Sequence, residues 1–419
     1  MGLRLFLLLV FLVVATSAGS NTKKLVTTLP GYSGELPFKL ETGYIGVGEN
    51  ETAQLFYYFV ESQRNPLRDP ILIWISGGPG CSGLGSFVFE SGTLPTLHDK
   101  PWTWTQGLNI VYLDAPVGAG FSYSETSDGY AMDDYKYVAQ AYEFIQKWLI
   151  EHPQFMENQL YVGGESYGGK PVPMIVQQIV IGNEAGNVPM IYLKIHDPNG
   201  YMIESPVTDS FTDSNAKIPL AHRLTLISDP NSTNCNGNFV NVEASNYQCS
   251  SDIDAIDQLL SKINTLHILQ PYCLNGFPEL NEESFSEKPT SALWCPGTLQ
   301  FWQYRNTTLA YTTTVTSVVG YHRNLTNTDL RLLVYNGDHD ISVPNIGTRE
   351  WIKSLNLTAD ESWRVWSVNG QTAGYTEELI NDYFTLTYAT VKGGCHYAAE
   401  DMVKECAAMI DRWMAYFPV

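Results

Sequence analysis

The sequence predicts an α/β fold with a mainly parallel central sheet and an inserted cap region. Short apolar runs alternate with helical segments in the first half of the chain, and the alternation returns near the C-terminus. Such alternation is typical of parallel strands that are joined by crossover helices. The length of 419 residues fits one large α/β domain with an insertion.

Six runs of the chain are strand candidates, and the first three each end in a turn that carries Gly or Asp. A helical segment over 135–150 separates the second run from the third, and a further helix is expected to begin at Ser166. An amphipathic helix over 398–416 closes the chain. The expected strands span 71–75, 109–113, 159–162, 331–335, 363–367 and 386–391.

Composition separates an insertion from the core. Residues 200–325 are rich in Asn, Ser and Cys and contain only short periodic pieces, so we expect them to form a cap over the sheet edge where the strands end. The core then consists of residues 21–199 and 326–419.

The first 20 residues have the order of a cleaved secretory signal peptide. Arg4 precedes an apolar run of ten residues, 5–14, and small residues follow. That run is shorter than the ~20 residues that span a bilayer, so we expect no stable membrane anchor after cleavage. Five sequons support a lumenal protein, and their glycosylation candidates are Asn50, Asn231, Asn306, Asn324 and Asn356.

Charge and cysteine content exclude some functions. The formal net charge is −20, whereas nucleic-acid binding needs a basic face, so we expect no nucleic-acid partner. None of the cysteine or histidine spacings is that of a metal site, and neither a metal nor a cofactor is expected. The seven cysteines are an odd number, so at least one thiol is free or pairs outside the chain.

The strongest motif is Gly164-Glu165-Ser166-Tyr167-Gly168, which matches G-x-S-x-G after a strand and before a helix. On such a sharp turn the serine oxygen stands exposed above the sheet, and the helix N-terminus directs backbone N–H groups at a developing oxyanion. By itself the pattern is equally compatible with an ordinary glycine-rich turn. Together with the predicted sheet it indicates an α/β-hydrolase fold with Ser166 as the nucleophile.

In this fold the acid and the histidine follow the serine in chain order. Asp340 and His396 both lie in loops after expected strands, so they complete the predicted triad, although Asp338 and His339 compete locally. His396 would take the proton from Ser166, and Asp340 would hold the imidazole in one tautomer. The oxyanion would be held by backbone N–H groups of Gly78, in a glycine-rich turn after the first strand, and of Tyr167.

Several ordered motifs resemble those of the serine carboxypeptidase family from about residue 26 to the C-terminus. The motifs are Gly-Gly-Pro-Gly-Cys-Ser at 77–82, Leu-Asp-Ala-Pro-Val-Gly at 113–118 with Gly-Phe-Ser-Tyr at 120–123, Gly-Glu-Ser-Tyr at 164–167, the 337–340 run and the Gly-Gly-x-His end at 393–396. Short sequence segments in the cap region and at 373–375 and 388–394 resemble those of the plant serine carboxypeptidase-like acyltransferases. That branch typically transfers an acyl group from a 1-O-β-glucose ester to an acceptor, usually in the vacuole.

The resemblance also assigns substrate-binding positions to Ser76, Gly77, Glu90 and Glu165. In peptidases of the family an Asn at the place of Ser76 and two Glu residues bind the C-terminal carboxylate of a peptide. Here both Glu residues are kept, but a hydroxyl cannot offer the amide's NH₂ donor. The change at Ser76 favours acyl transfer, whereas Glu165 favours a peptidase, because many of the acyltransferases have Asp there.

Other positions depart from the family pattern. Of the usual disulfides we still expect the one between Cys235 and Cys249, while Cys295 is a possible substitute partner for Cys81. Glu204-Ser205-Pro206 replaces a usual Gly-Asn-Pro.

Three functions therefore stay open. The first is transfer of an acyl group from a glucose ester to a plant metabolite, and the second is a carboxypeptidase acting on peptide C-termini at acid pH. The third is an inactive lumenal binding protein. The expected location is the secretory pathway, ending in the vacuole or outside the cell.

Overall fold

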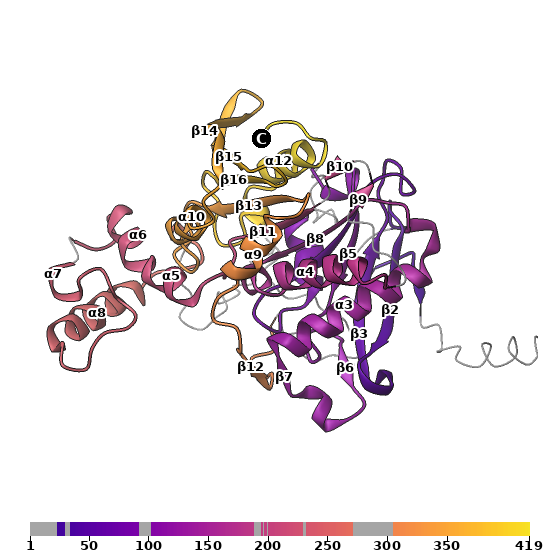
Figure 1. Cartoon of the computed structure of the whole chain (residues 1–419), viewed down its shortest axis with the longest axis horizontal. Coiled ribbons are helices and arrows are strands. Elements are labelled where there is room, and N and C mark those ends of the chain that lie inside the picture. The colour runs from indigo at the N-terminus through magenta and orange to yellow at the C-terminus, as the bar shows by residue number, and fades with distance from the viewer. Residues whose placement is uncertain are drawn as a thin grey trace, which may run out of the picture.

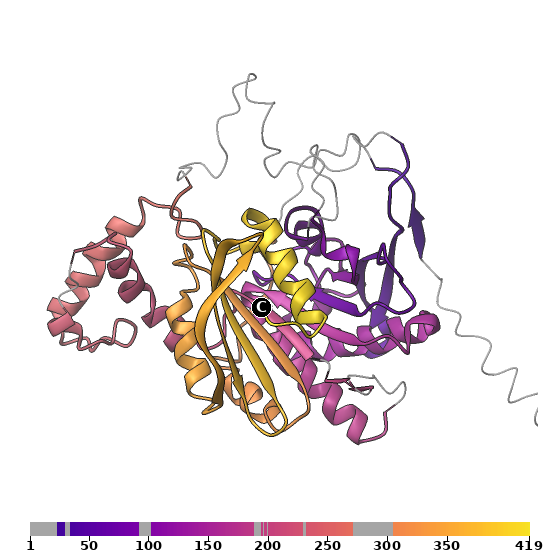
Figure 2. The same cartoon turned by 90° about the horizontal axis from the view of Figure 1, so that it is seen from above.

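The computed structural model describes residues 23–29, 34–91, 102–187, 194–195, 197–198, 200–228, 232–270 and 305–419. Within these ranges one large sheet forms the centre of the molecule, and helices cover both of its faces (Figures 1 and 2). The expected signal peptide, Asn231 and Cys295 lie outside the described residues.

The strands come from nearly the whole length of the chain. The strands of the large sheet are β1 (Lys24–Val26), β2 (Leu40–Val47), β3 (Ala53–Val60), β4 (Ile71–Ile75), β5 (Asn109–Leu113), β6 (Tyr123–Ser124), β8 (Leu160–Glu165), β11 (Gly200–Glu204), β13 (Arg331–Gly337), β14 (Thr358–Val368), β15 (Gln371–Ile380) and β16 (Thr385–Val391). Two smaller pairs join β7 (Met132–Asp133) to β12 (Tyr311–Thr312) and β9 (Lys194–Ile195) to β10 (Asp197–Pro198).

The order of the large sheet is β1-β2-β3-β5-β4-β8-β11-β13-β16-β15-β14, with β6 paired to β3. The neighbours from β5 through β16 are parallel. The strands on either side of this block are antiparallel. The expected α/β-hydrolase fold with a mainly parallel sheet is confirmed, and the parallel block aligns the carboxyl ends of its strands along one edge.

The helices fall into long ones that cover the sheet and shorter ones in the loops and the insertion. They are α2 (Gly83–Gly85), α3 (Asp134–Glu151), α4 (Pro171–Glu184), α5 (Ser210–Asn215), α6 (Lys217–Arg223), α7 (Ser232–Cys235), α8 (Tyr247–Leu260), α9 (Val319–Leu325), α10 (Asn345–Lys353), α11 (Ala398–Asp401) and α12 (Val403–Met414). A π-helical turn spans Ser86–Glu90, and 3-10 turns span Glu49–Glu51, Trp104–Gln106, Ser127–Tyr130, Pro153–Phe155 and Ser166–Gly169.

Both faces of the sheet are apolar, so its central strands are continuous hydrophobic runs. In β4, Ile71, Ile73 and Ile75 point into one core, and Leu72 and Trp74 point into the other. This alternation follows from the two-residue period of a strand.

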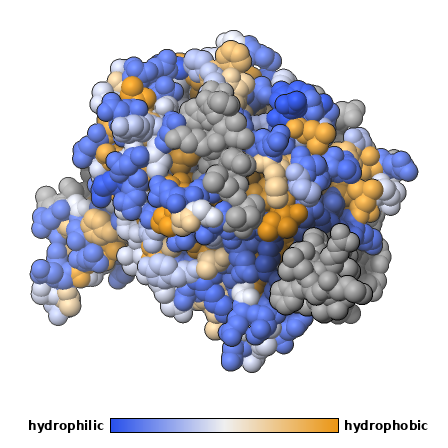
Figure 3. Space-filling model, turned by 45° about the vertical axis from the view of Figure 1, so that its right-hand side comes forward, coloured by the Kyte–Doolittle hydropathy of each residue, from blue (hydrophilic) through white to orange (hydrophobic). Residues whose placement is uncertain are grey.

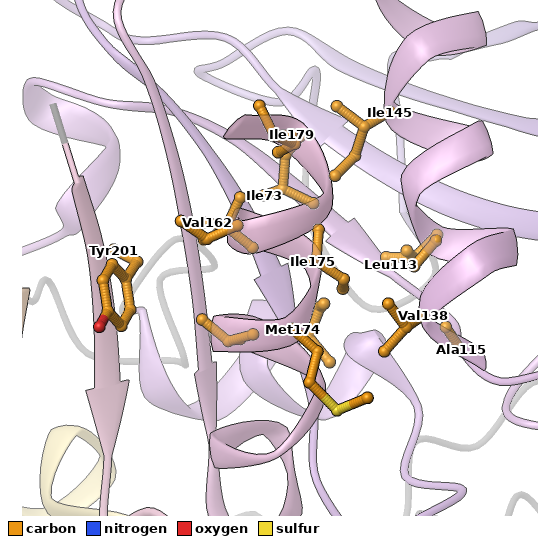
Figure 4. Close-up of a cluster of buried hydrophobic side chains, with 14 of the residues drawn as sticks. Ile73, Leu113, Ala115, Val138, Ile145, Val162, Met174, Ile175, Ile179 and Tyr201 are labelled. Atoms are coloured by element: carbon orange, nitrogen blue, oxygen red, sulfur yellow. The ribbon is translucent and has the colours of Figure 1, made fainter. Parts of the chain in front are cut away.

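The first core lies between the sheet and the helices α3 and α4. Figure 4 shows Val138 of α3 and Ile175 of α4 among side chains of the central strands. The second core is closed by α12, whose Met409 and Trp413 are buried against the opposite face. Truncating such a buried side chain to Ala typically lowers the free energy of unfolding by about 2–5 kcal/mol, so both helix layers contribute to the stability of the sheet.

The expected cap boundary at residue 200 needs correction. Residues Gly200–Glu204 form β11, which lies between β8 and β13 in the middle of the sheet. The run is only five residues long and is followed at once by Asn- and Ser-rich sequence, so composition assigned it to the insertion. Its burial, complete along all five residues, assigns it to the core.

Two expected helix boundaries also differ. Ser166 has φ 55°, which is left-handed, so the α-helix cannot begin there and begins instead at Pro171 after a 3-10 turn. The closing helix is interrupted at Met402, whose φ −109° and ψ 49° are not helical, and it divides into α11 and α12.

The described part of the insertion is mainly helical. Figure 1 shows α6, α7 and α8 together at one side of the sheet, next to α5. Ile218, Leu220 and Ile227 pack with Ile341 of the core in a small separate cluster. The expected disulfide joins Cys235 to Cys249, with Cα atoms 4.9 Å apart, and therefore ties α7 to α8.

Polar residues dominate the part of the surface shown in Figure 3. The face in Figure 3 is largely hydrophilic, with small separate apolar patches. Among the described helices, none has the length and apolar character that crossing a membrane requires.

We predict that the disulfide stabilises the insertion locally. Replacing both Cys235 and Cys249 with Ser should speed hydrogen exchange at the amides of α8, because the crosslink closes a short loop (sequence separation 14) and such a crosslink contributes about 3 kcal/mol. The amides of β8 and β13 serve as the internal control and should keep their protection. Unchanged exchange in α8 would contradict the prediction.

Candidate active site

The candidate nucleophile lies on a strained turn at the end of β8. Ser166 has a positive φ of 55°, which is uncommon for a residue with a side chain and is typical of strain at functional sites. Gly164 and Gly168 pack against β4, since a Cβ on either would come within 2.8 Å of the carbonyl oxygen of Ile75. The residues on either side are buried, whereas Ser166 keeps partial exposure.

The candidate acid and histidine are in direct contact. Asp340 follows β13 and His396 follows β16, and His396 Nδ1 lies 2.7 Å from Asp340 Oδ2. The other carboxylate oxygen of Asp340 accepts hydrogen bonds from the backbone N–H groups of Ser342 (2.7 Å) and Val343 (3.1 Å). Both side chains are buried, so the carboxylate fixes the orientation of the imidazole ring.

The electrostatic environment favours the imidazolium form of His396. Burial lowers the pKa of His396, but the charge and hydrogen bond of Asp340, together with the charges of Glu165 and Glu204, raise that pKa above its ordinary value. The competing pair Asp338 and His339 is engaged elsewhere, because Asp338 accepts from Gly393 N (2.8 Å) and lies 2.7 Å from His339 Nδ1.

The candidate oxyanion hole lies where the turn after β4 meets the nucleophile turn. A Cβ on Gly77 would come within 2.7 Å of Ser166 Cβ and 2.8 Å of Tyr167 N, so the two turns are in contact. Gly78 has φ +109°, a left-handed conformation that favours glycine. The N–H of Tyr167 lies in the first turn of a helical segment, where it has no intrahelical acceptor. The turn that carries Gly78 therefore packs against the turn that carries Tyr167 N.

A buried carboxyl group supports the glycine-rich turn. Asp114 accepts hydrogen bonds from Ser82 Oγ (2.8 Å), Gly83 N (2.7 Å) and Phe121 N (2.8 Å). Burial raises the pKa of Asp114 to about 6 against these hydrogen bonds. Asp114 thus connects the glycine-rich turn to the loop that carries Phe121.

The end of the insertion is tied to the nucleophile helix through a second carboxyl group. Asp134 accepts from Tyr167 OH, from Tyr311 OH (2.8 Å) and from Val315 N (2.8 Å). Lys170 Nζ donates to the carbonyl oxygen of Val315 at 2.6 Å. The residue after Ser166 is therefore anchored to the chain that returns from the insertion.

A further segment of the insertion contacts both catalytic loops. His396 N donates to the carbonyl oxygen of Leu266 (2.8 Å), and Ile341 N donates to that of Thr265 (2.9 Å). Ile268 N donates to the carbonyl oxygen of His339 (3.4 Å). The loops that carry Asp340 and His396 thus share one support, which no sequence motif indicated because the contacts are made by backbone atoms.

The expected substrate-binding positions lie together next to the oxyanion turn. Glu165 Oε1 accepts from Gly77 N at 2.7 Å, and the hydroxyl oxygens of Ser76 and Ser86 are 2.7 Å apart. Glu90 and Glu165 are buried. Burial, with the charges of Glu165 and Glu204, raises the pKa of Glu90 well above its ordinary range.

A third buried carboxyl group, Glu204, joins this pair. It is aligned with Glu165 in the parallel pairing of β8 and β11, and burial raises its pKa to about 7. The sequence signals it only as a departure from the family pattern, an acidic residue at the end of an apolar run. Its role in the site was therefore not assigned from the sequence.

The remaining expected positions have different surroundings. Asn50, Asn324 and Asn356 are exposed, whereas Asn306 is partly buried and donates from Nδ2 to the carbonyl oxygen of Gly118 (2.9 Å). Cys81 forms a β-bridge with Arg305. Among the described residues, no group of three or more Cys, His, Asp or Glu is arranged to hold a metal ion.

Comparisons with known proteins agree on one family. The sequence profile described as serine carboxypeptidase matches residues 30–416. The chain is 41% identical to serine carboxypeptidase-like 10 of Arabidopsis thaliana over 99% of this chain and 98% of that protein. It is 39% identical to serine carboxypeptidase-like 13 of the same plant over the full length of both. Among solved structures, the prohormone-processing carboxypeptidase Kex1(Δ)p from Saccharomyces cerevisiae has a similar fold, with a TM-score of 0.70 at 16% identity, covering 90% of this chain and 91% of that one.

We predict that Gly77→Ala inactivates Ser166 without unfolding the protein. The added Cβ would press on Ser166 Cβ, Glu165 O and Tyr167 N at 2.7–2.8 Å. Because displacements of about 1 Å cost about 100-fold in rate, we expect a fall of that size in labelling by a serine-directed fluorophosphonate. Gly320→Ala is the matched control, since nothing lies within 4 Å of its Cβ. Labelling of Gly77→Ala at the wild-type rate would contradict the prediction.

We predict that the protein is more stable at pH 5 than at pH 8. Burial raises the pKa of Asp114 to about 6 and those of Glu204 and Asp213 to about 7. Their stabilisation is complete below the unfolded pKa values near 4 and is lost as the pH rises through 6–7. The lowered pKa values of Glu41, Asp134 and Asp209 act only below about pH 4–5, so they do not oppose this trend. The buried His322, whose pKa is lowered to about 3, does oppose it below about pH 6.5, but this one group does not offset the three raised carboxyl groups.

The urea midpoint, measured from pH 4 to 9, tests this prediction. Each pKa unit corresponds to about 1.4 kcal/mol, so we expect a free energy of unfolding at least about 1–2 kcal/mol higher at pH 5 than at pH 8. Asp213→Asn should reduce the difference. A midpoint that is equal at both pH values, or higher at pH 8, is incompatible with it.

Proposed function

This chain belongs to the serine carboxypeptidase family, and we propose that it is an acyltransferase. In the proposed reaction it moves an acyl group from a 1-O-β-glucose ester to a plant metabolite acceptor through an acyl-enzyme on Ser166. A serine carboxypeptidase-like enzyme is the class to which family and fold both point. Neither a metal nor a cofactor takes part in the proposed chemistry.

The proposed first step is attack by Ser166 on the ester carbon of the donor. His396 takes the serine proton, Asp340 stabilises the imidazolium, and the N–H groups of Gly78 and Tyr167 hold the oxyanion. Glucose leaves with the proton from His396, and the acyl-enzyme remains. His396 then takes a proton from the acceptor, which attacks the acyl carbon, and gives that proton to Ser166 Oγ as the bond between the acyl group and the serine breaks.

One observation carries the choice of acyl transfer over peptide hydrolysis. The hydroxyl of Ser76 lies 2.7 Å from that of Ser86, so it is engaged within the protein. Glu165 accepts a hydrogen bond from the neighbouring Gly77 N, and its charge acts on the buried carboxyl groups of Glu90 and Glu204. A peptide carboxylate would meet like charges there without an amide donor at position 76, whereas a neutral sugar ester carries no such charge.

A carboxypeptidase is the second candidate, and the carboxyl pair itself favours it. Glu165 is fixed by Gly77 N, and the pKa of Glu90 is raised, so at acid pH the pair can share a proton and accept a substrate carboxylate. An inactive binding protein is less well supported, because the hydrogen bond between Asp340 and His396 is intact.

The proposed location follows from the N-terminal sequence and from the raised pKa values of the buried carboxyl groups. We propose that the protein enters the secretory pathway and works in the vacuole or outside the cell. Its proposed partners are a small acyl-glucose donor and a metabolite acceptor, with a peptide C-terminus in the second candidate.

We predict acyl transfer that depends on Ser166. The glycosylated protein is supplied with a panel of 1-O-acylglucose esters and acceptors at pH 5–6, and in parallel with a blocked dipeptide. Ser166→Ala should lose roughly 10⁴-fold or more of the transfer rate, whereas Ser127→Ala, at an exposed serine, should keep it. Ser76→Asn should raise peptide hydrolysis relative to transfer, because it restores an amide donor.

The outcomes separate the three candidates. Peptide cleavage by the wild type without any acyl product would establish the carboxypeptidase instead. Absence of both activities, together with absence of fluorophosphonate labelling at Ser166, would establish the binding protein.

A further inference from the structure

We propose that Glu204 is a positioning residue for this reaction, whose carboxylate stabilises the protonated form of His396 and thereby sets the pH range in which His396 accepts the proton of Ser166. The inference rests on the proposed function only in that Ser166 and His396 form the catalytic pair. It holds whether water or an acceptor resolves the acyl-enzyme.

Glu204 lies at the point of the sheet where the catalytic loops begin. Its strand, β11, is hydrogen-bonded to β8 on one side and to β13 on the other, with Glu204 aligned with Glu165 and Tyr335. Ser166 follows directly after Glu165, and Asp340 follows β13. The parallel register therefore places a carboxyl group between the strand that delivers the nucleophile and the strand that delivers the acid.

The carboxyl group is hydrogen-bonded to the segment that carries His396. Glu204 Oε1 accepts from Ala399 N at 3.1 Å, three residues after His396, and Glu204 Oε2 accepts from Tyr335 OH at 2.9 Å. Glu204 has no exposed surface. Two donors and complete burial hold the carboxyl group in one place, where solvent does not screen its charge.

The segment after Glu204 also supports the nucleophile. Ser205 has a positive φ of 40°, and its N–H donates to the carbonyl oxygen of Tyr335 at 2.8 Å. Val207 N donates to the carbonyl oxygen of Ser166 at 2.9 Å. The chain from Glu204 to Val207 thus contacts the loops of both the nucleophile and the histidine.

The other titratable groups described around Glu204 are acidic or neutral, whereas the charge of His396 is positive when its ring is protonated. Glu165 faces it from β8, Glu90 from the π-helical turn, Tyr335 from β13 and Cys406 from α12. The pKa values of Tyr335 and Cys406 are raised by burial, so both stay neutral at the pH of the reaction.

Acidic side chains from the neighbouring helices also act on this group. Glu400 of α11 interacts with Glu90, and Asp401 of α11 and Glu405 of α12 interact with Cys406. Of the charges that act on His396, those of Asp340, Glu165 and Glu204 all favour the imidazolium.

The consequence is a coupled titration. An ionised Glu204 raises the pKa of His396, and a protonated His396 lowers that of Glu204, so the pair loses its protons in macroscopic steps. Removing the charge of Glu204 lowers the pKa of His396. The acidic limb of the pH–rate profile then moves to lower pH, while the rate on the plateau changes little.

The experiment measures the rate of fluorophosphonate labelling of Ser166 from pH 4 to pH 9 in the full chain. We expect Glu204→Gln, which keeps the size and a hydrogen-bond acceptor, to move the acidic limb down by about 0.5–1 pH unit. Glu204→Asp keeps the charge, so its acidic limb should differ from that of the wild type by no more than about half of the shift expected for Glu204→Gln. Asp213→Asn removes another buried carboxyl group whose pKa is about 7 but which is not among the charges acting on His396, and it should leave the limb unmoved.

A second measurement covers the case in which Glu204→Gln does not fold. In the wild-type protein with ¹³C-labelled histidine, the NMR shift of His396 should follow two ionisations, one from the ring and one near pH 7 from its neighbour. A single ionisation, or a Glu204→Gln profile that coincides with wild type, overturns the proposal. Failure of Ser166 to label at any pH would instead contradict the proposed function.

Discussion

The parallel pairing of four neighbouring strands is the constraint on which the site depends. The hydrogen bonds that join β8, β11, β13 and β16 fix their register, so their carboxyl ends lie along one edge. Ser166, Asp340 and His396 each follow one of those ends, although more than 200 residues of sequence separate the first from the last. The buried apolar faces of β4 and β8 hold this edge in place through the two helix layers, so the chemistry depends on the packing of side chains far from it.

The same edge concentrates carboxyl groups that water does not reach. Burial and the negative charge of Glu165 raise the pKa values of Glu90 and Glu204 above the ordinary range. Both carboxyl groups therefore keep their protons to higher pH than an exposed carboxyl group does. Acidic residues therefore occur not only on the surface but also among the buried residues of the candidate site.

The sequence was sufficient to predict those elements whose residue pattern depends directly on their local environment. The strands β4 and β5 are continuous apolar runs, and the motif around Ser166 combines the residue types that a tight strand-to-helix turn requires. Prediction failed where tertiary contacts decide the structure. The five residues of β11 are too short a run to be distinguished from the sequence of the insertion. Thr265 and Leu266 support the loops of Asp340 and His396 through backbone atoms, so their side chains give no sign of this role. Glu204 was visible as an unusual residue, but its role follows only from its alignment with Glu165.

The contacts from Thr265 and Leu266 to the catalytic loops are made by main-chain carbonyl oxygens. Any amino acid at these two positions can present the same oxygen, provided that the backbone keeps its course. Side chains at these positions can therefore be exchanged without loss of the hydrogen bonds that support the loops of Asp340 and His396. The surface of this segment can diverge while the geometry of the two loops stays fixed.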